Sequence, residues 1–423
     1  MISVWKHYDL TKFNLWIRLI GITGLTQVLV QFLGFISGVL VIRLLPVEEY
    51  ALYTLANTML ATMVLLADGG ISTGVLSQGG KVWKDEIELG KVLSTGIYLK
   101  KRFAYLSIIV AFPILIYLLL RHDASWLTAI LVALAIIPAF YAQFSDSLLT
   151  IVPKLHQNIG DLQKNQAVVS FGRLILTTLF LFIFPFTFLA LLASGIPRIY
   201  GNRRLMKISA INVDTSQQKD PVYTKRIIST VKRLLPGIIY YCISGQITIW
   251  LLSFFGSTTS IAQIGALGRL AVVLSLLNYL TGTLLIPRFA RKENKREALL
   301  VLFLKIMLVT IFFLTGIVLI VNFFPDQILW ILGDEYTGLQ KELTLIIMGS
   351  ALNIVAGVAY SLNASRDWIL NPLISISLSV LSIIVGIIIF DVSILKGVLY
   401  LNIFLAIFQI LIYGSYSAYK LMK

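Results

Sequence analysis

Long apolar segments recur along the whole chain, and lysine and arginine gather in every second gap between them. Each segment holds about 20 residues, enough for a helix to cross the roughly 30 Å hydrocarbon core of a bilayer. About four-fifths of the 35 lysines and arginines fall in these alternate gaps. This bias is typical of cytoplasmic loops. The pattern predicts an all-α integral membrane protein with many spans.

Composition supports a membrane protein over a soluble one. Of the 423 residues, 58% are hydrophobic and 13% are charged, whereas a soluble domain carries about a quarter charged residues. The net charge of +15 is accompanied by no motif that binds DNA or RNA. We therefore expect no nucleic-acid partner, and we interpret the basic loops as topology signals that attract anionic membrane lipids.

The apolar pattern predicts twelve transmembrane helices, at residues 19–42, 51–78, 103–120, 125–149, 165–184, 186–200, 233–255, 262–286, 298–321, 342–363, 370–390 and 395–418. One kinked helix is the alternative to the pair 165–184 and 186–200. We favour two, because Pro185 cannot continue a helical hydrogen-bond ladder and because two helices keep the basic gaps on one side. Both termini are then cytoplasmic.

The longest polar stretch, residues 201–232, is predicted to be a cytoplasmic linker. It divides an N-terminal six-helix lobe, residues 1–200, from a C-terminal six-helix lobe, residues 233–423. Both lobes start on the same side, so we expect parallel repeats related by an axis along the membrane normal, around a central cavity.

The gaps are too short to hold the machinery of an enzyme. The three histidines, His7, His122 and His156, lie in separate gaps without metal-ligand spacing. Residues 70–74 match a nucleophile elbow in letters, but they lie in a predicted membrane helix rather than between a strand and a helix. Residues 74–81 lack the Ser or Thr of a phosphate loop. We expect no catalysis and no cofactor beyond a coupling ion, Na⁺ or H⁺.

Charged side chains at membrane depth are costly and normally face a bundle interior or a wet cavity. Cations predominate among the candidates, which suits an anionic ligand, since arginine grips phosphate oxygens in a bidentate way. The predicted substrate-binding residues are Arg18, Arg43, Arg173 and Arg269. Alternatively, Arg18, Arg43 and Lys305 snorkel to the interface, and Arg173 pairs with an acid.

Other polar residues are candidates for coupling or for lining the cavity: Asp68, Asp146, Gln27, Gln31, Asn57 and Asn278. Gln27 and Gln31 are four residues apart and share one helix face. Asp146 could instead be solvated near a helix end. Hydrogen bonding between helices is the alternative for the amides, including Gln246, Asn353 and Asn402.

Three motifs carry a resemblance to a known family. They are Arg43-Leu-Leu-Pro-Val-Glu-Glu-Tyr, Leu66-Ala-Asp-Gly-Gly-Ile and Leu332-Gly-Asp-Glu-Tyr-Thr. By these three motifs and their order along the chain, the protein resembles Wzx-type polysaccharide flippases. These belong to the multidrug/oligosaccharidyl-lipid/polysaccharide exporter superfamily.

The resemblance implies two six-helix lobes around a cationic cavity. It also implies a lipid-linked anionic oligosaccharide, carried on undecaprenyl pyrophosphate, as substrate, and other polysaccharide-assembly proteins as partners. By motif position, Arg43 and Asp68 are its site residues. We expect an ion gradient or the membrane potential to drive the movement. The alternatives are a drug or organic-cation antiporter of the same superfamily, which would favour an acid-rich cavity, a membrane polysaccharide polymerase, and a scaffold that transports nothing.

Overall fold

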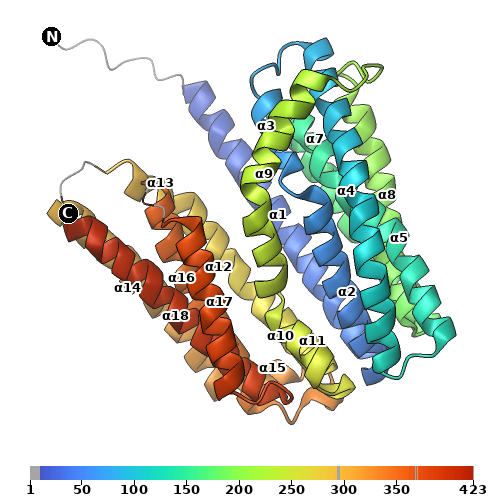
Figure 1. Ribbon diagram of the computed structural model, residues 1–423, viewed down its shortest axis with the longest axis vertical. Coiled ribbons are helices and arrows are strands. Elements are labelled where there is room, and N and C mark those ends of the chain that lie inside the picture. Colours follow the sequence, from blue (N-terminus) through green and yellow to red (C-terminus); the bar gives the residue numbers. More distant parts are fainter. Residues whose placement is uncertain (1–9, 293–295, 367, 369, 423) are drawn as a thin grey trace. The chain divides into compact units, whose positions relative to one another are not determined.

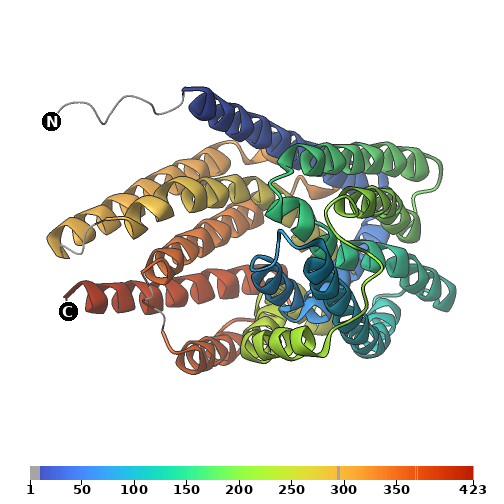
Figure 2. The same cartoon turned by 90° about the horizontal axis from the view of Figure 1, so that it is seen from above.

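The computed structural model describes residues 10–292, 296–366, 368 and 370–422, without the side chains of residues 10–25, 276, 279, 283, 284, 421 and 422. The described residues form helices joined by turns, and none of them forms a strand (Figure 1; Figure 2). The prediction of an all-α chain is confirmed.

The chain divides into two compact units. Unit 1 consists of the chain up to Leu44 together with Met59–Leu120 and Ala124–Ile238. Unit 2 consists of Leu45–Thr58, Arg121–Asp123 and the chain from Ile239 onward. The division of the chain into lobes at residues 201–232 stays a prediction.

The helices up to residue 244 are α1 (Leu10–Leu44), α2 (Val47–Asp68), α3 (Ile71–Gly79), α4 (Glu86–Arg121), α5 (Trp126–Leu149), α6 (Ile151–Leu155), α7 (Ile159–Ile183), α8 (Thr187–Ser209) and α9 (Pro221–Ser244). Beyond it lie α10 (Ile247–Phe255), α11 (Thr258–Ala271), η1 (Val272–Leu274), α12 (Ser275–Leu280), η2 (Thr281–Leu285), α13 (Ile286–Ala290), α14 (Arg296–Phe323), α15 (Pro325–Leu329), η3 (Asp334–Tyr336), α16 (Gln340–Ala364), α17 (Pro372–Ile389) and α18 (Leu395–Met422). Helices α2 and α9 each contribute to both units.

Nine helices of the described part are long and apolar enough to cross a membrane. A tenth span is formed if α9 and α10, which meet at an angle of 52°, count as one. Each of the twelve predicted segments overlaps a helix of the structure. The chain is therefore a multi-pass membrane protein.

The predicted helix 51–78 is wrong as a single element. It is broken after Asp68, where Gly69 has a φ of 49° and Gly70 a φ of 91°. Glycine adopts this left-handed region without steric cost, so the two residues end α2 and re-aim the chain into α3. A side chain at Gly70 would also meet Leu234 of α9, with its Cβ at 3.1 Å from the Leu234 Cβ.

The predicted pair 165–184 and 186–200 is confirmed, and the alternative of one kinked helix is wrong. Helix α7 ends at Ile183 and α8 begins at Thr187, with Pro185 in the break. Helix α8 continues beyond the apolar segment to Ser209, and α9 already begins at Pro221. The predicted linker 201–232 is therefore helical except at residues 210–220.

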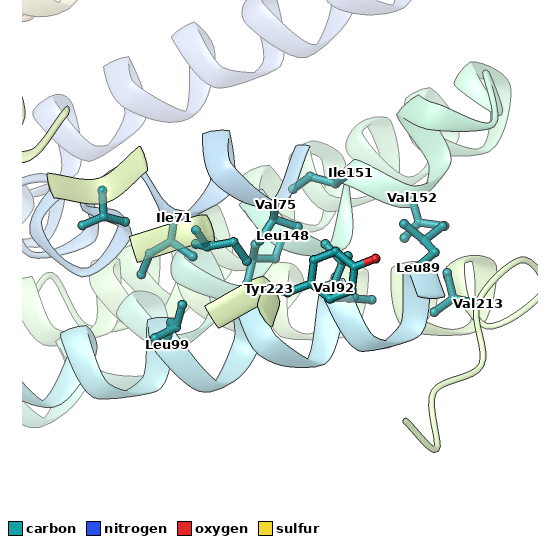
Figure 3. Packing of buried hydrophobic residues seen from close by; sticks show 13 residues of the cluster. Ile71, Val75, Leu89, Val92, Leu99, Leu148, Ile151, Val152, Val213 and Tyr223 are labelled. Atoms are coloured by element: carbon teal, nitrogen blue, oxygen red, sulfur yellow. The ribbon is translucent and has the colours of Figure 1, made fainter. Parts of the chain in front are cut away.

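In unit 1, α3, α4 and α9 share a buried apolar cluster with residues of α5 and α6 (Figure 3). Helix α9 contributes Tyr223, Ile227 and Val231, which are four residues apart and therefore lie on one face. Helix α3 contributes Ile71 and Val75, again four apart. This packing fixes α9 against α3 and leaves the basic residues of α9 on its other side.

In unit 2, α16 packs along α18 and also contacts α14, and α17 packs against α18. A second buried cluster joins Phe289 of α13 to α14 and α16. The guanidinium of Arg366, directly after α16, donates hydrogen bonds to the backbone carbonyls of Phe289 and Lys292, the first at 2.8 Å. Arg366, predicted as a loop charge, thus holds two helix ends together.

Candidate functional site

Unit 2 contains a cavity of about 290 Å³, here called the arginine cavity, with walls from α2, α10, α11 and the turn before α10. Its lining residues are Tyr50, Tyr53, Thr54, Asn57, Thr58, Gln246, Ile249, Ile264, Gly265, Gly268, Arg269 and Val272. Most side chains on the α2 wall recur at helical spacings of three and four, so one face of α2 supplies them.

Arg269 is the charged residue of this lining, and it is half-buried. The side chains of Tyr50 and Tyr53 lie close enough to its guanidinium to interact with it electrostatically. The two tyrosine rings stack with their centroids 5.9 Å apart. The guanidinium therefore lies beside a pair of stacked aromatic side chains, in a cavity whose lining carries no acidic side chain.

Glycine brings α11 close to α2. A Cβ at Gly265 would collide with the side chain of Thr54, so only glycine permits this approach. On the α2 side, the Asn57 amide donates a hydrogen bond to the Tyr53 carbonyl at 3.0 Å, and the Thr54 hydroxyl donates to the Tyr50 carbonyl at 2.9 Å. These bonds fix the rotamers that face the cavity.

Two of the motifs noted in the sequence meet here. Tyr336, from the turn Leu332–Thr337, is buried and lies close enough to Tyr50 to interact with it electrostatically. Burial raises the pKa of Tyr336, so its hydroxyl stays protonated. Tyr50, Tyr53 and Tyr336 were missed by the sequence analysis. The recurrence of Glu-Tyr in both turns was the available signal.

A second cavity of unit 2, here called the amide cavity, has a volume of about 550 Å³. Its lining contains no charged residue: Tyr240, Tyr241, Ser244, Gly245, Ile247, Thr248, Asn353, Gly357, Tyr360, Ser379, Ser382, Ile383, Asn402, Leu405, Gln409 and Tyr413. Amides and hydroxyls both donate and accept hydrogen bonds. Such a surface suits a neutral, polyhydroxylated ligand.

Two contacts order the amide cavity. The Asn353 amide of α16 donates to the Asn402 amide oxygen of α18 at 2.8 Å, so the hydrogen bonding between helices expected for these amides is confirmed. The rings of Tyr360 and Tyr413 lie 5.2 Å apart. The bend between α9 and α10 borders both cavities, because Gln246 lines the arginine cavity and its neighbours Gly245 and Ile247 line the amide cavity.

Unit 1 holds a buried ion pair. The ammonium of Lys100 lies 2.8 Å from Oδ1 of Asp68, with the Lys100 side chain fully buried and that of Asp68 24% exposed. Lys100 also donates to the Phe144 carbonyl at 2.8 Å and to the hydroxyls of Ser72 and Ser147. The break after Asp68 brings Ser72 round to donate to the same carboxylate.

The predicted helix 103–120 leaves Lys100 in the gap before it, and this limit is wrong. Helix α4 starts at Glu86, well before the apolar run, so Lys100 lies within a helix. Gly96, Lys100 and Ser107 recur at spacings that share one face of α4, and this small and polar face was the signal that could have located the residue. A buried lysine is stable only with a counter-charge, and Asp68 was already a candidate polar residue of the sequence.

A second group of charges in unit 1 joins α5, α7 and α8. Asp146 interacts electrostatically most strongly with Arg198, and also with Lys154 and Lys100, while Arg198 interacts in turn with Arg173. Asp146, Arg173 and Arg198 are all half-buried. Arg198 lies within the predicted helix 186–200 but was not among the candidate site residues.

The other candidates lie elsewhere. Arg43 is exposed near the end of α1, Gln27 and Gln31 are half-buried in α1, and Asn278 is exposed in α12. Arg18 is in α1, but its side chain lies outside the described residues. Of the candidates, the arginine cavity unites Arg269 with Asn57, and unit 1 links Asp68, Asp146 and Arg173 through Lys100 and Arg198. In the described part, no three His, Cys, Asp or Glu side chains gather as metal ligands.

The chain is similar in structure to several solved membrane transporters. An inward-facing multidrug resistance MATE family transporter of the MOP superfamily matches with a TM-score of 0.75 and 13% identity, over 92% of this chain and 95% of that one. The lipid II flippase MurJ, in an inward closed conformation, matches with a TM-score of 0.72 and 15% identity, over 95% and 87%. A MOP superfamily transporter from Pyrococcus furiosus, described as having a binding pocket of reverse polarity, matches with a TM-score of 0.62 and 14% identity, over 96% of both chains.

No family model matches the sequence. No curated protein matches it either. The structural likeness at these identities shows a shared fold: the chain has the fold of MOP-superfamily transporters.

Proposed function

We propose that the chain is a Wzx-type flippase of the MOP superfamily, in a bacterial inner membrane with both termini cytoplasmic. Its substrate is an oligosaccharide linked to undecaprenyl pyrophosphate, which it moves from the inner to the outer leaflet by alternating access. One observation carries the proposal. The arginine cavity presents Arg269 beside Tyr50 and Tyr53 and has no acidic lining residue, which suits an anionic headgroup and repels an organic cation.

The pyrophosphate binds at Arg269. The planar guanidinium donates two parallel hydrogen bonds to phosphate oxygens, and the hydroxyls of Tyr50 and Tyr53 hold it in orientation. Because the guanidinium is half-buried, its charge is screened less than it would be at an open surface. A phosphate bound there therefore gains more electrostatic binding free energy than one bound at the basic loops.

The sugars bind in the amide cavity. Its amides and hydroxyls pair with sugar hydroxyls, and its tyrosine rings offer faces for the sugar rings. Because residues 245–247 border both cavities, a carrier with its pyrophosphate at Arg269 extends its glycan toward Asn353 and Gln409. The neighbour that is described as a lipid II flippase supports a lipid-linked substrate for this fold.

The pair of Asp68 and Lys100 is the element that we assign to coupling with H⁺. A proton on Asp68 neutralises the carboxylate and leaves the ammonium of Lys100 buried without a counter-charge, which costs several kcal/mol. Such a cost is enough to favour a rearrangement of the helices around Lys100. Coupling to Na⁺ would use the same carboxylate.

Glycan export from cells tests the proposal. A strain lacking the gene is complemented with Arg269→Ala, with Arg269→Lys, or with Lys305→Ala, which removes an exposed cation from α14. We expect Arg269→Ala to lower surface glycan at least about tenfold, with carrier-linked glycan accumulating on the inner leaflet and the protein level unchanged. Lys305→Ala should export normally. Normal export by Arg269→Ala would refute the assignment.

A further inference from the structure

Unit 1 has a basic pocket that the proposed transport path does not use. It has a volume of about 600 Å³ and lies between the end of α3 and the first half of α9. Its lining residues are Gln78, Lys81, Lys225, Arg226, Ser229, Thr230 and Arg233. Four of the seven side chains are cationic, two carry hydroxyls, and none is acidic. We call it the α3–α9 pocket.

The sequence of α9 builds one wall of this pocket. Tyr223, Ile227 and Val231 are buried in the cluster of Figure 3. Lys225, Ser229 and Arg233 follow the same four-residue step, shifted by two positions, so they form a second line along the helix. One side of α9 thus anchors the helix, and the opposite side carries positive charge into a pocket whose lining has no acidic residue.

Glycine packing fixes the width of the pocket. A Cβ at Gly74 of α3 would lie 3.1 Å from Cγ2 of Ile227 and 3.4 Å from its Cα, tighter than ordinary van der Waals contact. Helices α3 and α9 therefore touch nearly backbone to backbone just before the pocket opens. This contact holds Gln78, one turn beyond Gly74, at a fixed distance from the basic face of α9.

Gln78 is the feature that distinguishes this pocket from a solvated basic surface. Its side chain lines the pocket but is only 8% exposed, and its Oε1 has no hydrogen-bond partner. A buried polar group without a partner costs about 1–3 kcal/mol. Since the amide can turn by 180° with little change in shape, it can offer N–H donors to a ligand oxygen in the pocket.

We propose that the α3–α9 pocket binds a phosphate group. Arg226 and Arg233 supply planar donors for phosphate oxygens, Lys81 and Lys225 supply point charges, and Ser229, Thr230 and Gln78 supply neutral hydrogen bonds. The phosphate is either the headgroup of an anionic lipid or part of a soluble compound. This proposal does not depend on the flippase assignment, because it concerns different residues in the other unit.

The test uses the purified full-length protein in a neutral detergent, with two probes. Inorganic pyrophosphate represents a soluble phosphate, and dioleoyl phosphatidic acid represents a lipid headgroup, with dioleoylglycerol as its neutral match. Binding is measured by isothermal titration for pyrophosphate and by native mass spectrometry for the lipids. Binding of the lipid alone identifies a headgroup site, and binding of pyrophosphate, with or without the lipid, identifies recognition of the phosphate itself.

Three variants locate the site. The double variant Lys225→Gln/Arg233→Gln should lower the affinity for the probe that binds, at least about tenfold. Gln78→Leu, which keeps the volume but not the amide, should weaken it about threefold, and should do so even at high salt, where long-range attraction is screened. Arg203→Gln/Lys207→Gln removes two basic residues from α8, outside the pocket, and should leave affinity unchanged.

The folded state is checked by gel filtration and by the thermal midpoint. The proposal is overturned if neither probe binds, or if the α8 variant loses as much affinity as the pocket variant, since binding would then follow net charge alone.

Discussion

The ammonium of Lys100 lies 2.8 Å from the Asp68 carboxylate, although the Lys100 side chain is completely buried. Neighbouring polar groups stabilise this buried ion pair. Ser72, Ser147 and the Phe144 carbonyl complete the hydrogen bonds of the ammonium. The pair therefore satisfies the main requirement for burying charge, which is that each partner is neutralised and hydrogen-bonded.

Removing one member of this pair should destabilise unit 1 more than removing both. Asp68→Asn leaves the buried ammonium uncompensated, at a cost of about 3 kcal/mol, the lower end for such a loss because Asp68 is partly exposed. Asp68→Asn/Lys100→Met should recover most of that loss. The thermal midpoint in detergent measures both, and equal midpoints for the single and double variants would contradict the ion-pair account.

Protonation of His122 should make stability fall in acid. Its ring nitrogens lie 3.0 Å from the Ser253 carbonyl and 3.1 Å from the Thr258 hydroxyl. Burial, the largest cause, lowers the pKa of His122 below 6.5. Above pH 6.5 the imidazole is neutral in both states. As the pH falls below 6.5, the unfolded chain binds the proton first, so the free energy of unfolding decreases until the pKa of the folded state is passed.

Thermal midpoints at pH 7.5 and pH 5.5 measure this dependence. The difference between them should shrink in His122→Gln and persist in His156→Gln, the control for loss of another imidazole. The same pH dependence in all three proteins would show that His122 does not cause it.

The tyrosine hydroxyls of the arginine cavity should contribute to headgroup binding through Arg269. Tyr50→Phe/Tyr53→Phe keeps both rings but removes the hydroxyls of the two side chains that interact electrostatically with the guanidinium. We expect the KM for a lipid-linked substrate to rise about fivefold, with a smaller change in kcat. Tyr105→Phe, on the exposed part of α4, is the matched control. A change in kcat without a change in KM would argue against a role in binding.

The amide cavity should determine how much of the glycan is recognised. Gln409→Leu keeps the side-chain volume but removes a hydrogen-bonding amide from the lining. Affinity for a carrier with several sugars should fall about threefold to tenfold, while affinity for a carrier with a single sugar stays constant. Competition between the two carriers for the purified protein measures this difference, and equal losses for both would exclude selective contact with the glycan.

Much of the fold could be predicted because a membrane span is a local property of the sequence. Apolar runs of helical length located every span, and Pro185 located the turn between α7 and α8. The limits of the helices could not be read in this way. Helices α4 and α8 continue into basic segments outside their apolar runs, so Lys100 was placed in a gap between two predicted helices. Gly69 and Gly70 broke a helix that its apolar content predicted to be continuous.

The arginine cavity could be predicted only in part, because only some of its residues stand out in the local sequence. Arg269 was identified because a charge at membrane depth is unusual. Tyr50 and Tyr53 were not identified, because tyrosine is frequent at membrane interfaces and the importance of these two comes from their proximity to Arg269, about 200 positions away in the chain. Asn57 was noted as a polar residue in a helix, but only the fold shows that it faces the same cavity as Arg269.

Transbilayer movement of a defined substrate tests the central claim most directly. The purified protein is reconstituted into liposomes with a fluorescent undecaprenyl-pyrophosphate oligosaccharide, and a membrane-impermeant quencher reports the fraction in the outer leaflet over time. We predict that the wild-type protein moves the lipid, that Arg269→Lys retains part of the rate, and that Arg269→Ala falls to the rate of protein-free liposomes. Equal rates for Arg269→Ala and the wild-type protein, or no movement of this lipid by the wild-type protein, would contradict the account.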